Sequence, residues 1–447
     1  MLLTLVSFLF AIGLLVTVHE YGHYRIAKTL GVKVLTFSIG FGKPLLKWQC
    51  GETQWQIAAI PLGGFVRMLG EDEDQSLLPI ESARAFNRQH PLRKMAIVVA
   101  GPLANLVLAW LFFSAALLIG VDSIKPVAGS IRVGSPMAIS GLHIGDEIVR
   151  LGGRDVLSWD DLRLAALTEM GFKTQMMVRS PDGAEHDLQL NLRKTGEEFF
   201  DANILARLGL TPIPLLNRIA QVESGSVAAQ AGLQAGDSIV AANDNPIAQW
   251  ESLQDIVAKN PGRTMHLSVR RSSDLLDISV TPSLDVSSVG PIGRLGVMPQ
   301  VDEVRFTLQK FTLQMSLFPA LQRGGQKVWD LSSLTFRLIG QMLIGKLSSR
   351  QISGPIGMAS MAGESAGLGL TAYLQYLAMI SLSLGVLNLL PVPVLDGGHL
   401  LYHSAELVRG RPLPESWFIV GQRLGIALLV GLMLLALYND IHRFIPG

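Results

Sequence analysis

The stretch His19-Glu20-Tyr21-Gly22-His23 directly follows residues 2–18, an apolar run without a charged side chain. A His-Glu-x-x-His sequence on a helix places two imidazoles one turn apart on one face, which suits a single zinc ion (Zn2+). The glutamate between them can act as a general base. Because this helix begins as an apolar run, the sequence predicts a hydrolytic zinc centre in or beside a lipid bilayer, with His19 and His23 as ligands and Glu20 as the catalytic base.

Two other interpretations of this segment remain to be weighed. The two histidines could share a helix face by chance, without a metal. Residues 1–18 could also be a secretory signal peptide, but no Lys or Arg precedes the apolar run and no small-x-small cleavage site follows it. A membrane-spanning helix that carries the motif is therefore the favoured interpretation.

The composition of the whole chain also indicates a membrane protein. Of its 447 residues, 49% are hydrophobic and only 16% are charged. Residues 95–120 and 367–390 are further apolar segments, and residues 424–438 complete a fourth one if the turn at 417–420, before Gln422 and Arg423, is included. Each approaches or exceeds the length needed to cross a bilayer, about 20 residues. The fold class predicted is an α-helical polytopic membrane protein with four transmembrane helices.

The net charge and the cysteine content limit which partners and which metal ligands the chain can have. A net charge of +1 gives no reason to expect a nucleic acid partner. Cys50 is the single cysteine, which excludes an internal disulfide and a cysteine-based zinc site. Any metal in this chain must therefore be bound by His, Asp or Glu.

The distribution of Lys and Arg predicts how the chain is oriented in the membrane. Ten of them lie between the first two apolar segments, and Arg409 and Arg411 lie between the last two. Loops rich in Lys and Arg stay in the cytoplasm. We therefore expect both termini and the region between the second and third segments to lie outside the cytoplasm, with the zinc motif near the cytoplasmic face.

The region between the second and third apolar segments contains an internal repeat. Gly-Ser at 134–135 and Gly-Leu-x-x-Gly-Asp-x-Ile-Val at 141–149 recur 91 positions later, at 225–226 and 232–240. A constant offset over many identities indicates two copies of one module. A short helix should open near Ser135 and Ser226, and Gly145 and Gly236 should turn the chain into a strand.

The repeated pattern resembles the PDZ domain in its circularly permuted form, and it implies two tandem PDZ-like domains of mixed α/β structure. Domains of this kind bind extended peptide ends by adding a strand to a sheet edge. The alternative is that the pair acts as a plug or size filter that keeps bulky proteins away. The sequence leaves both possibilities open.

A membrane-associated β region should follow the zinc motif. Residues 33–39 alternate as a strand, residues 40–44 break it, and residues 46–49 and 54–60 form a hairpin around Cys50, with 61–64 ending the unit. An edge strand here could hold an extended substrate beside the metal, and Gly40, Phe41 and Gly42 are the candidate substrate-binding residues. The alternative is a plain sheet that closes the site.

The third metal ligand is expected near the end of the third apolar segment. Residues 388–399 read Asn-Leu-Leu-Pro-Val-Pro-Val-Leu-Asp-Gly-Gly-His, which places Asp396 beside the bilayer. An ionisable residue there is costly and is therefore a functional candidate. Asp396 could instead cap the helix that starts near Gly397. His399, one turn further along, is a rival ligand.

The two metal motifs, together with Gly-Pro-Leu-Ala-Asn at 101–105, resemble the site-2 protease family of membrane zinc metalloproteases, and the likeness extends over essentially the whole chain. The resemblance implies His19, His23 and Asp396 as ligands, Glu20 as base and Asn388 as a substrate-contacting residue. It implies a bacterial inner-membrane enzyme that cuts transmembrane segments of single-pass proteins, among them an anti-sigma factor and remnant signal peptides. The competing hypothesis is a membrane scaffold whose PDZ pair tethers partners while its zinc site is structural or inactive.

The predicted domain organisation follows from these segments. It comprises a first transmembrane helix at 1–30, a cytoplasmic or re-entrant β region at 31–94, a second transmembrane helix at 95–120, PDZ-like domains at 121–213 and 214–302, amphipathic helices on the outer membrane surface at 303–366, a third transmembrane helix with the Leu-Asp-Gly motif at 367–397, and a cytoplasmic link with a fourth transmembrane helix at 398–447.

Overall fold

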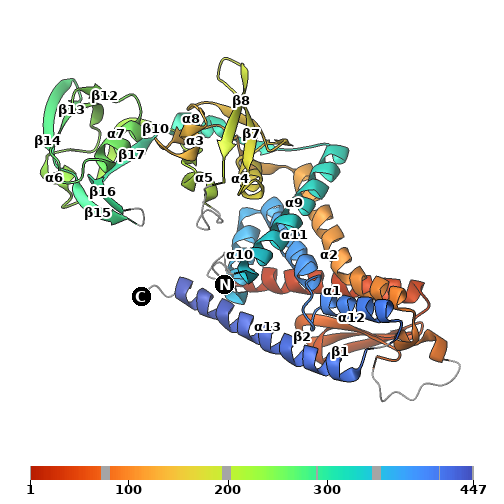
Figure 1. The fold of residues 1–447 in the computed structure, drawn as a ribbon. Helices are drawn as coiled ribbons and strands as arrows, with labels where there is room; N and C mark the ends of the chain where they lie inside the picture. Colours follow the sequence, from red (N-terminus) through yellow and green to blue (C-terminus); the bar gives the residue numbers. More distant parts are fainter. Residues whose placement is uncertain are drawn as a thin grey trace. The chain divides into compact units, whose positions relative to one another are not determined.

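The computed structural model describes residues 2–71, 81–193, 203–287, 290–344, 354–411 and 413–444. The chain divides into two compact units (Figure 1). Met1–Val121 and Gln314–Gly447 form a helical unit with one long β-hairpin, and Asp122–Leu313 form a second, largely β unit. The two units are described separately.

Helices dominate the first unit because its sequence consists mainly of long apolar segments. The helices are α1 (Leu2–Thr29), α2 (Pro91–Ile119), α9 (Leu317–Leu343), α10 (Pro355–Leu368), α11 (Leu370–Asn388), α12 (Asp396–Arg409) and α13 (Glu415–Phe444), with short 3-10 turns at Ser82–Arg84 and Phe86–Arg88. Of the described helices, α1, α2, α11 and residues Ile419–Asp440 of α13 are long and apolar enough to cross a membrane. The predicted number of four helices that could span a membrane is confirmed. Their orientation stays a prediction.

Helix α2 is the centre of this unit and packs against α1, α9, α11 and α12. Small residues allow the close approaches. A Cβ atom on Gly22 of α1 would lie 2.4 Å from the Ala100 carbonyl oxygen, and one on Gly385 of α11 would lie 2.9 Å from that of Pro102. Contacts through small residues are how membrane helices pack when lipid is as apolar as their side chains.

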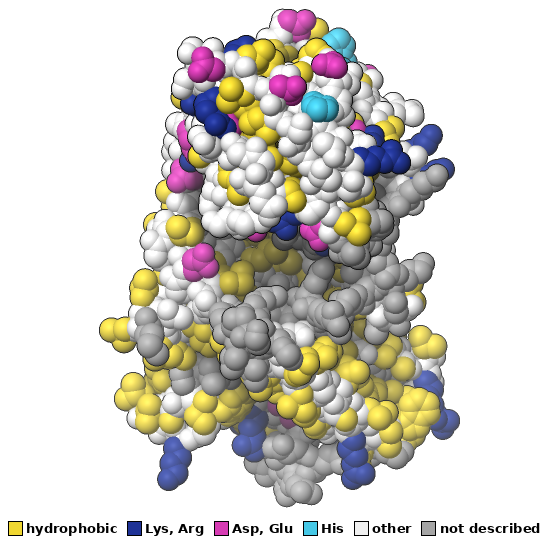
Figure 2. Space-filling view, turned by 90° about the vertical axis from the view of Figure 1, so that its left-hand side faces the viewer, with side chains coloured by type: hydrophobic (Ala, Val, Ile, Leu, Met, Phe, Trp, Pro, Cys, Tyr) yellow, Lys and Arg dark blue, Asp and Glu magenta, His cyan; other side chains and the backbone are white. Residues whose placement is uncertain are grey.

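The outer surfaces of the spanning helices are apolar. Leu428, Met433 and Leu434 of α13 are each about half exposed or more, at 51%, 57% and 62%. Figure 2 shows hydrophobic side chains covering much of the lower part of one face of the molecule, with Lys and Arg along its lower margin. Exposed apolar area of this extent marks a surface that faces lipid or a partner.

The hairpin of β1 (Val34–Cys50) and β2 (Thr53–Met68) is longer and more folded than the sequence predicted. Both strands bend, so Phe37 pairs with Trp55 on one side and with Val66 on the other, and Trp48 also pairs with Trp55. The segment at 64–68 is therefore an edge of a sheet in which four segments lie side by side. The prediction that 61–64 ends the unit is wrong, because β2 continues through these residues to Met68.

The region at 303–366, predicted as amphipathic helices, is interrupted by a strand. Helix α8 (Glu303–Gln309) leads into β18 (Lys310–Leu313), which pairs with β3 (Val121–Ile124). The Thr312 hydroxyl also donates to Asp122 at 3.1 Å. The partner strand lies almost 190 positions away in the sequence, so the local pattern could not reveal this pairing.

The second unit consists of two lobes with separate hydrophobic cores. The first lobe has its core around Met137, Ile148, Leu162 and Met176, and the second around Ile239, Trp250, Leu253 and Leu267. The sheet order is β6-β5-β7-β8 in the first and β14-β13-β11-β10-β17 in the second, with β12 paired to β11.

The elements of the two lobes have the following bounds. The first contains β4 (Ser130–Ile131), α3 (Pro136–Ile139), β5 (Glu147–Leu151), β6 (Arg154–Asp155), α4 (Trp159–Thr168), β7 (Lys173–Arg179), β8 (Glu185–Asn191), α5 (Ile204–Arg207) and β9 (Leu210–Thr211). The second contains β10 (Leu215–Val222), α6 (Val227–Gln230), β11 (Ser238–Ala242), β12 (Asn245–Pro246), α7 (Trp250–Ala258), β13 (Met265–Arg271), β14 (Asp274–Val280), β15 (Ser283–Ser287), β16 (Gly290–Arg294) and β17 (Val297–Val301).

The sequence repeat is also a repeat of hydrogen bonds. Ser135 and Ser226 cap the short helices α3 and α6, and each hydroxyl accepts a backbone N–H three residues later at 3.2 Å. Asp146 and Asp237 each accept a backbone N–H from three residues earlier at 2.9 Å. The predicted helix starts and glycine turns are therefore confirmed at both positions.

Candidate metal centre and active site

Side chains from opposite ends of the sequence meet beside α2. His19 and His23 lie one turn apart on α1, and Asp396 is the first residue of α12. The Oδ2 atom of Asp396 lies 3.1 Å from Nε2 of His19 and 3.6 Å from Nε2 of His23. The two Nε2 atoms are 3.2 Å apart. In the described part of the chain, these three side chains form the group of His, Cys, Asp or Glu ligands that could hold a metal ion.

The geometry of this group fits zinc. Two ligand atoms at about 2.1 Å from a tetrahedral zinc ion are about 3.4 Å apart, which is close to the three separations given above. In addition, Asp396 Oδ2 is buried, and it faces the Nε2 atoms of His19 and His23. Two imidazole nitrogens and one carboxylate oxygen are ligands that catalytic zinc sites use, with one position left open. A buried carboxylate oxygen that faces two imidazole nitrogens is suited to binding a cation together with them.

The backbone of helix α2 contacts the His23 imidazole at its Nδ1 atom. Nδ1 of His23 lies 2.8 Å from the backbone carbonyl oxygen of Ile97, so that the ring turns Nε2 toward Asp396. Gly101 leaves the space that this ring occupies, because a Cβ atom there would lie 2.2 Å from His23 Nε2. The glycine of the Gly-Pro-Leu-Ala-Asn segment is therefore needed for the imidazole to sit between the helices.

Nδ1 of His19 also faces α2. The amide nitrogen Nδ2 of Asn105 lies 3.3 Å from it, and the Asn105 side chain is fully buried. Sequence reasoning gave Gly101 and Asn105 no individual role, although it noted their segment. The available signal was a polar Asn inside an otherwise apolar span, which is costly and hence a functional candidate.

Two glycines let α12 begin where it does. A Cβ atom on Gly397 would lie 2.1 Å from the Leu390 carbonyl oxygen, and one on Gly398 would lie 2.4 Å from that of Val392. The extended segment after α11 therefore passes directly against the first turn of α12. Leu395, and not Asp396, is the N-cap residue of this helix. The Asp396 carboxylate thus points to the histidines instead of closing the helix end.

Helices α12 and α2 pack against each other (Figure 1), and a buried ion pair joins them. Lys94 Nζ lies 3.2 Å from Glu406 Oε1, and the two side chains are 8% and 13% exposed. His403 Nδ1 lies 3.2 Å from the other oxygen of Glu406. These contacts fix the helix that carries Asp396 against the helix that supports both histidines.

Glu20 lies between the metal group and the β-hairpin. Its carboxylate interacts electrostatically with His23, His19 and Asp396, and the backbone N–H of Val66 in β2 forms a hydrogen bond with it. A Cβ atom on Gly64 would lie 3.1 Å from Glu20 Cγ. The edge segment of the sheet at 64–68 therefore runs directly beside the predicted base.

The remaining predicted site residues lie around this group. His399 is one turn along α12 and is not part of the metal-binding group of described residues. Asn388 is the last residue of α11, is partly buried, and makes no hydrogen bond to the metal group in the described part of the chain. Gly40 and Gly42 have φ values of 90° and 88°, which L side chains rarely adopt. Phe41 between them is 45% exposed and stacks on Phe65 at a centroid distance of 6.3 Å.

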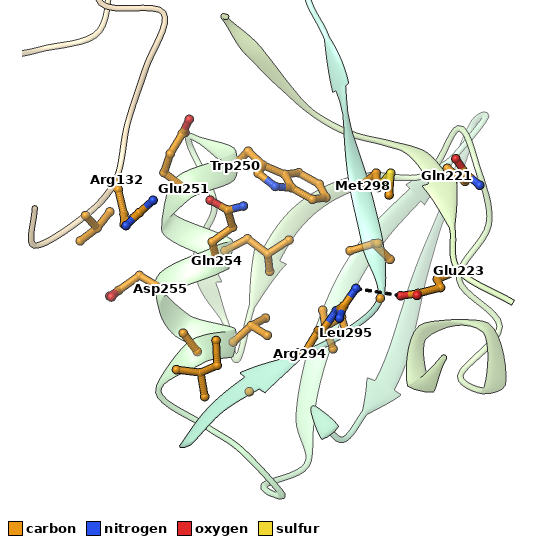
Figure 3. Close-up of a pocket in the computed structure, with 18 of the residues that line it drawn as sticks. Arg132, Gln221, Glu223, Trp250, Glu251, Gln254, Asp255, Arg294, Leu295 and Met298 are labelled. Atoms are coloured by element: carbon orange, nitrogen blue, oxygen red, sulfur yellow. Dashed lines mark hydrogen bonds and ion pairs between the residues drawn. The ribbon is translucent and has the colours of Figure 1, made fainter. Parts of the chain in front are cut away.

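A second candidate site is a pocket of about 880 Å³, lined mainly by the second lobe and also by Arg132 and Val133, which follow β4 of the first lobe (Figure 3). Trp250, Leu253 and Val257 of α7 form one wall, and Ile292, Leu295 and Met298, from β16 to β17, form the other. Strand β17 is the edge strand of its sheet. Arg294 pairs with Glu223 at 3.1 Å at one side of the pocket. An apolar groove between a helix and an edge strand is the geometry of peptide binding by strand addition.

Comparisons with known proteins agree with this geometry. The family model "Peptidase family M50" matches residues 7–432. Protease RseP of Yersinia pestis is 38% identical and the regulator of sigma-E protease RseP of Escherichia coli is 37% identical, each match covering 98% of both chains. A Neisseria meningitidis protein named as a zinc metalloprotease is 37% identical over 99% of both chains.

A solved structure also aligns with part of the chain. It is the PDZ domain of an SdrC-like protein from Listeria monocytogenes, at 19% identity, covering 20% of this chain and 90% of that one, with a TM-score of 0.17. The assignment of the chain rests on the family model and the full-length relatives instead. The chain belongs to peptidase family M50 and is a zinc metalloprotease.

Proposed function

We propose that this protein is an intramembrane endopeptidase that cuts the transmembrane segment of single-pass membrane proteins, with His19, His23 and Asp396 as its zinc ligands. The observation that carries the proposal is the meeting of the three side chains within 3.6 Å of one another, with both histidines on a helix apolar enough to span a bilayer. A scaffold with a structural zinc site would need a fourth protein ligand. The group of described residues supplies three.

The residues around the site have distinct roles in hydrolysis. Zinc, when bound, is a Lewis acid that polarises the scissile carbonyl and acidifies water. Glu20 accepts the proton of the attacking water and then delivers it to the leaving amine. The carboxylate interacts electrostatically with His19, His23 and Asp396, which supports proton transfer beside the metal group. Asn388 contacts the substrate backbone, where a hydrogen bond to the developing oxyanion contributes about 3 kcal/mol.

The β-hairpin can provide hydrogen-bond partners for the backbone of a membrane substrate that unwinds before cleavage. A transmembrane helix hides each carbonyl in an internal hydrogen bond, and unpaired backbone groups in lipid cost several kcal/mol each. The segment at 64–68 is a sheet edge beside Glu20, so an unwound substrate can pair with it as an added strand. The Gly40-Phe41-Gly42 bend supports this edge from the neighbouring segment and contacts the substrate.

The physiological setting follows from the relatives. Several relatives carry the name "regulator of sigma-E protease", and this chain aligns with nearly their full length. We infer an anti-sigma factor and remnant signal peptides as substrates, in the inner membrane of a bacterium. Both termini and Asp122–Leu313 then lie in the periplasm and the metal group lies near the cytoplasmic face, which agrees with the Lys and Arg count of the loops.

The two lobes between the second and third spans are assigned as PDZ-like domains. The pocket beside β17 supports binding of an extended periplasmic tail of the substrate, because apolar side chains of α7 and of β16 to β17 line it and an edge strand lies beside it. Ile292→Glu places a charge in this groove. It should reduce cleavage of a trimmed substrate if the groove binds its tail. If the lobes only exclude bulky domains, cleavage of the trimmed substrate stays unchanged.

Cleavage in a defined membrane tests the main proposal. The purified full chain is reconstituted into liposomes with a single-pass substrate, and the products are identified by mass spectrometry. New termini should lie inside the transmembrane segment, and a zinc chelator should abolish their formation until zinc is restored. Cuts confined to the aqueous parts of the substrate, or cleavage that survives chelation, would refute the proposal.

A further inference from the structure

Asn105 is a fully buried amide in the middle of an apolar helix. Its side chain makes one hydrogen-bonding contact among the described residues, between Nδ2 and Nδ1 of His19 at 3.3 Å. The other end of the amide, Oδ1, is buried without a partner in that part of the chain. A buried polar group with so few partners is unfavourable in an apolar surrounding. The contact with His19 is therefore the feature that accounts for an amide at this place.

The chemistry of metal binding specifies what this amide must do. Nε2 of His19 faces Asp396 and His23, so it is the nitrogen that binds the metal. A neutral imidazole that binds metal through Nε2 carries its proton on Nδ1, which is then a hydrogen-bond donor. A donor requires an acceptor, and a 180° rotation of the Asn105 amide exchanges Nδ2 for Oδ1 at the position near Nδ1.

The neighbouring ligand has an equivalent arrangement. Nδ1 of His23 lies 2.8 Å from the backbone carbonyl oxygen of Ile97, which is also on α2. Each imidazole thus has one nitrogen directed at the shared site and the other directed at an oxygen-bearing group of the same helix. His23 uses a main-chain carbonyl, and His19 has the side chain of Asn105 in the corresponding role.

We propose that Asn105 is a positioning residue of the zinc site: its Oδ1 accepts the Nδ1–H of His19, fixing the tautomer and the ring orientation that present Nε2 to the metal. The inference rests on the proposed function, in which His19 is a zinc ligand. Partners of this kind typically change metal affinity by about 10–100-fold when they are removed. The expected effect is therefore on metal binding itself and not only on cleavage.

Two substitutions with opposite expectations test this role in the full chain in detergent. Asn105→Asp keeps an oxygen acceptor, so zinc affinity measured by competition with a chromophoric chelator should stay within about threefold of the original. Asn105→Leu keeps the volume but removes the acceptor, and should weaken zinc binding about 10–100-fold. If Asn105 serves only to fill space, the order reverses, because a buried carboxylate is far less tolerated than a leucine.

A matched control and a second signal complete the test. Ser381→Ala removes a buried hydroxyl that donates to the Asn105 backbone carbonyl at 2.8 Å, and it should leave zinc affinity unchanged. With Co2+ in place of zinc, the visible absorption of the tetrahedral site should persist in Asn105→Asp and shift in Asn105→Leu. Asn105→Ala replaces the leucine variant if that variant does not fold, with the same expectation.

The outcomes separate this inference from the proposed function. Zinc binding by Asn105→Leu at the original affinity, or a greater loss in Asn105→Asp than in Asn105→Leu, would overturn the positioning role while leaving the zinc enzyme intact. Failure of the unsubstituted chain to bind zinc would instead overturn the proposed function itself.

Discussion

Nε2 of His19 lies 3.1 Å from Oδ2 of Asp396, although 377 positions separate the two residues in the sequence. The contact depends on α2, which packs against α1 on one side and α12 on another. A ligand set assembled in this way exists only in the folded membrane unit. Metal content is therefore a sensitive measure of whether the unit is assembled.

Replacing the carboxylate of this pair should release the metal. Asp396→Asn removes the charge that faces the two imidazoles, and we expect zinc content of the purified protein, measured by elemental analysis, to fall to a small fraction. Asp440→Asn is the matched control, because Asp440 is also a buried Asp but accepts N–H groups of Gly354 and Ile356. Normal zinc in Asp396→Asn would point to His399 as the ligand.

Gly101 should be as important for the site as a ligand is. A methyl group there would lie 2.2 Å from His23 Nε2, far inside contact distance. Gly101→Ala should therefore displace the imidazole and reduce both zinc content and proteolysis at least tenfold. Gly13→Ala on α1, where a Cβ atom meets nothing within 4 Å, should leave both unchanged. Equal behaviour of the two variants would contradict the tight packing of α1 on α2.

The Lys94–Glu406 pair should hold α12 in place. Breaking a buried pair leaves an uncompensated charge, which costs about 3–5 kcal/mol, whereas replacing both partners by apolar residues is often neutral. Lys94→Met should therefore lower the melting temperature in detergent and the zinc content. Adding Glu406→Leu to that variant should restore much of both. A double variant that is less stable than either single variant would show that the pair does not act as a unit.

Acid should loosen the second lobe before the first. The Arg271 guanidinium donates to Asp237 at 2.8 Å and holds the pKa of this carboxyl below its usual value. The pKa of Asp237 is higher in the unfolded chain, about 3.9. The ion pair therefore contributes its full stabilisation above that pH, and this stabilisation is lost as the pH falls through the lowered pKa of the folded state. The equivalent position in the first lobe, 91 residues before Arg271, is Ser180.

Hydrogen exchange of the full chain, corrected for intrinsic rates, checks this asymmetry. Protection of β11 and β13 should decline as the pH falls below about 4, and protection of β5 and β7 should decline less. Arg271→Met should reduce protection of β11 and β13 already at neutral pH and remove their difference from the first lobe. Identical acid profiles in the two lobes of the unsubstituted chain would contradict the role of the ion pair.

The sequence predicts those features that depend on local pattern. Apolar runs indicated four spanning helices, and the repeat placed the caps at Ser135 and Ser226 and the turns at Gly145 and Gly236. All of these depend on residues within a few positions of one another. The two metal motifs also identified His19, His23 and Asp396 as a group before their geometry was known.

Features that depend on distant partners were missed. The strand at β18 forms because β3 is available across the unit, and β2 passes through Pro61 and Gly63 because its second half pairs with the start of β1. The places of Gly101 and Asn105 against the imidazoles follow from the packing of α1 on α2. No spacing within either helix encodes these contacts.

Cleavage by the Glu20→Gln variant is the most direct test of the account. This substitution removes the proton acceptor but keeps the side-chain shape, and Glu20 is not one of the three proposed ligands. We expect a variant with the zinc content of the original chain and no detectable cut in a membrane-embedded substrate. Undiminished cleavage by a zinc-loaded Glu20→Gln variant would contradict the assignment of the catalytic base and the mechanism built on it.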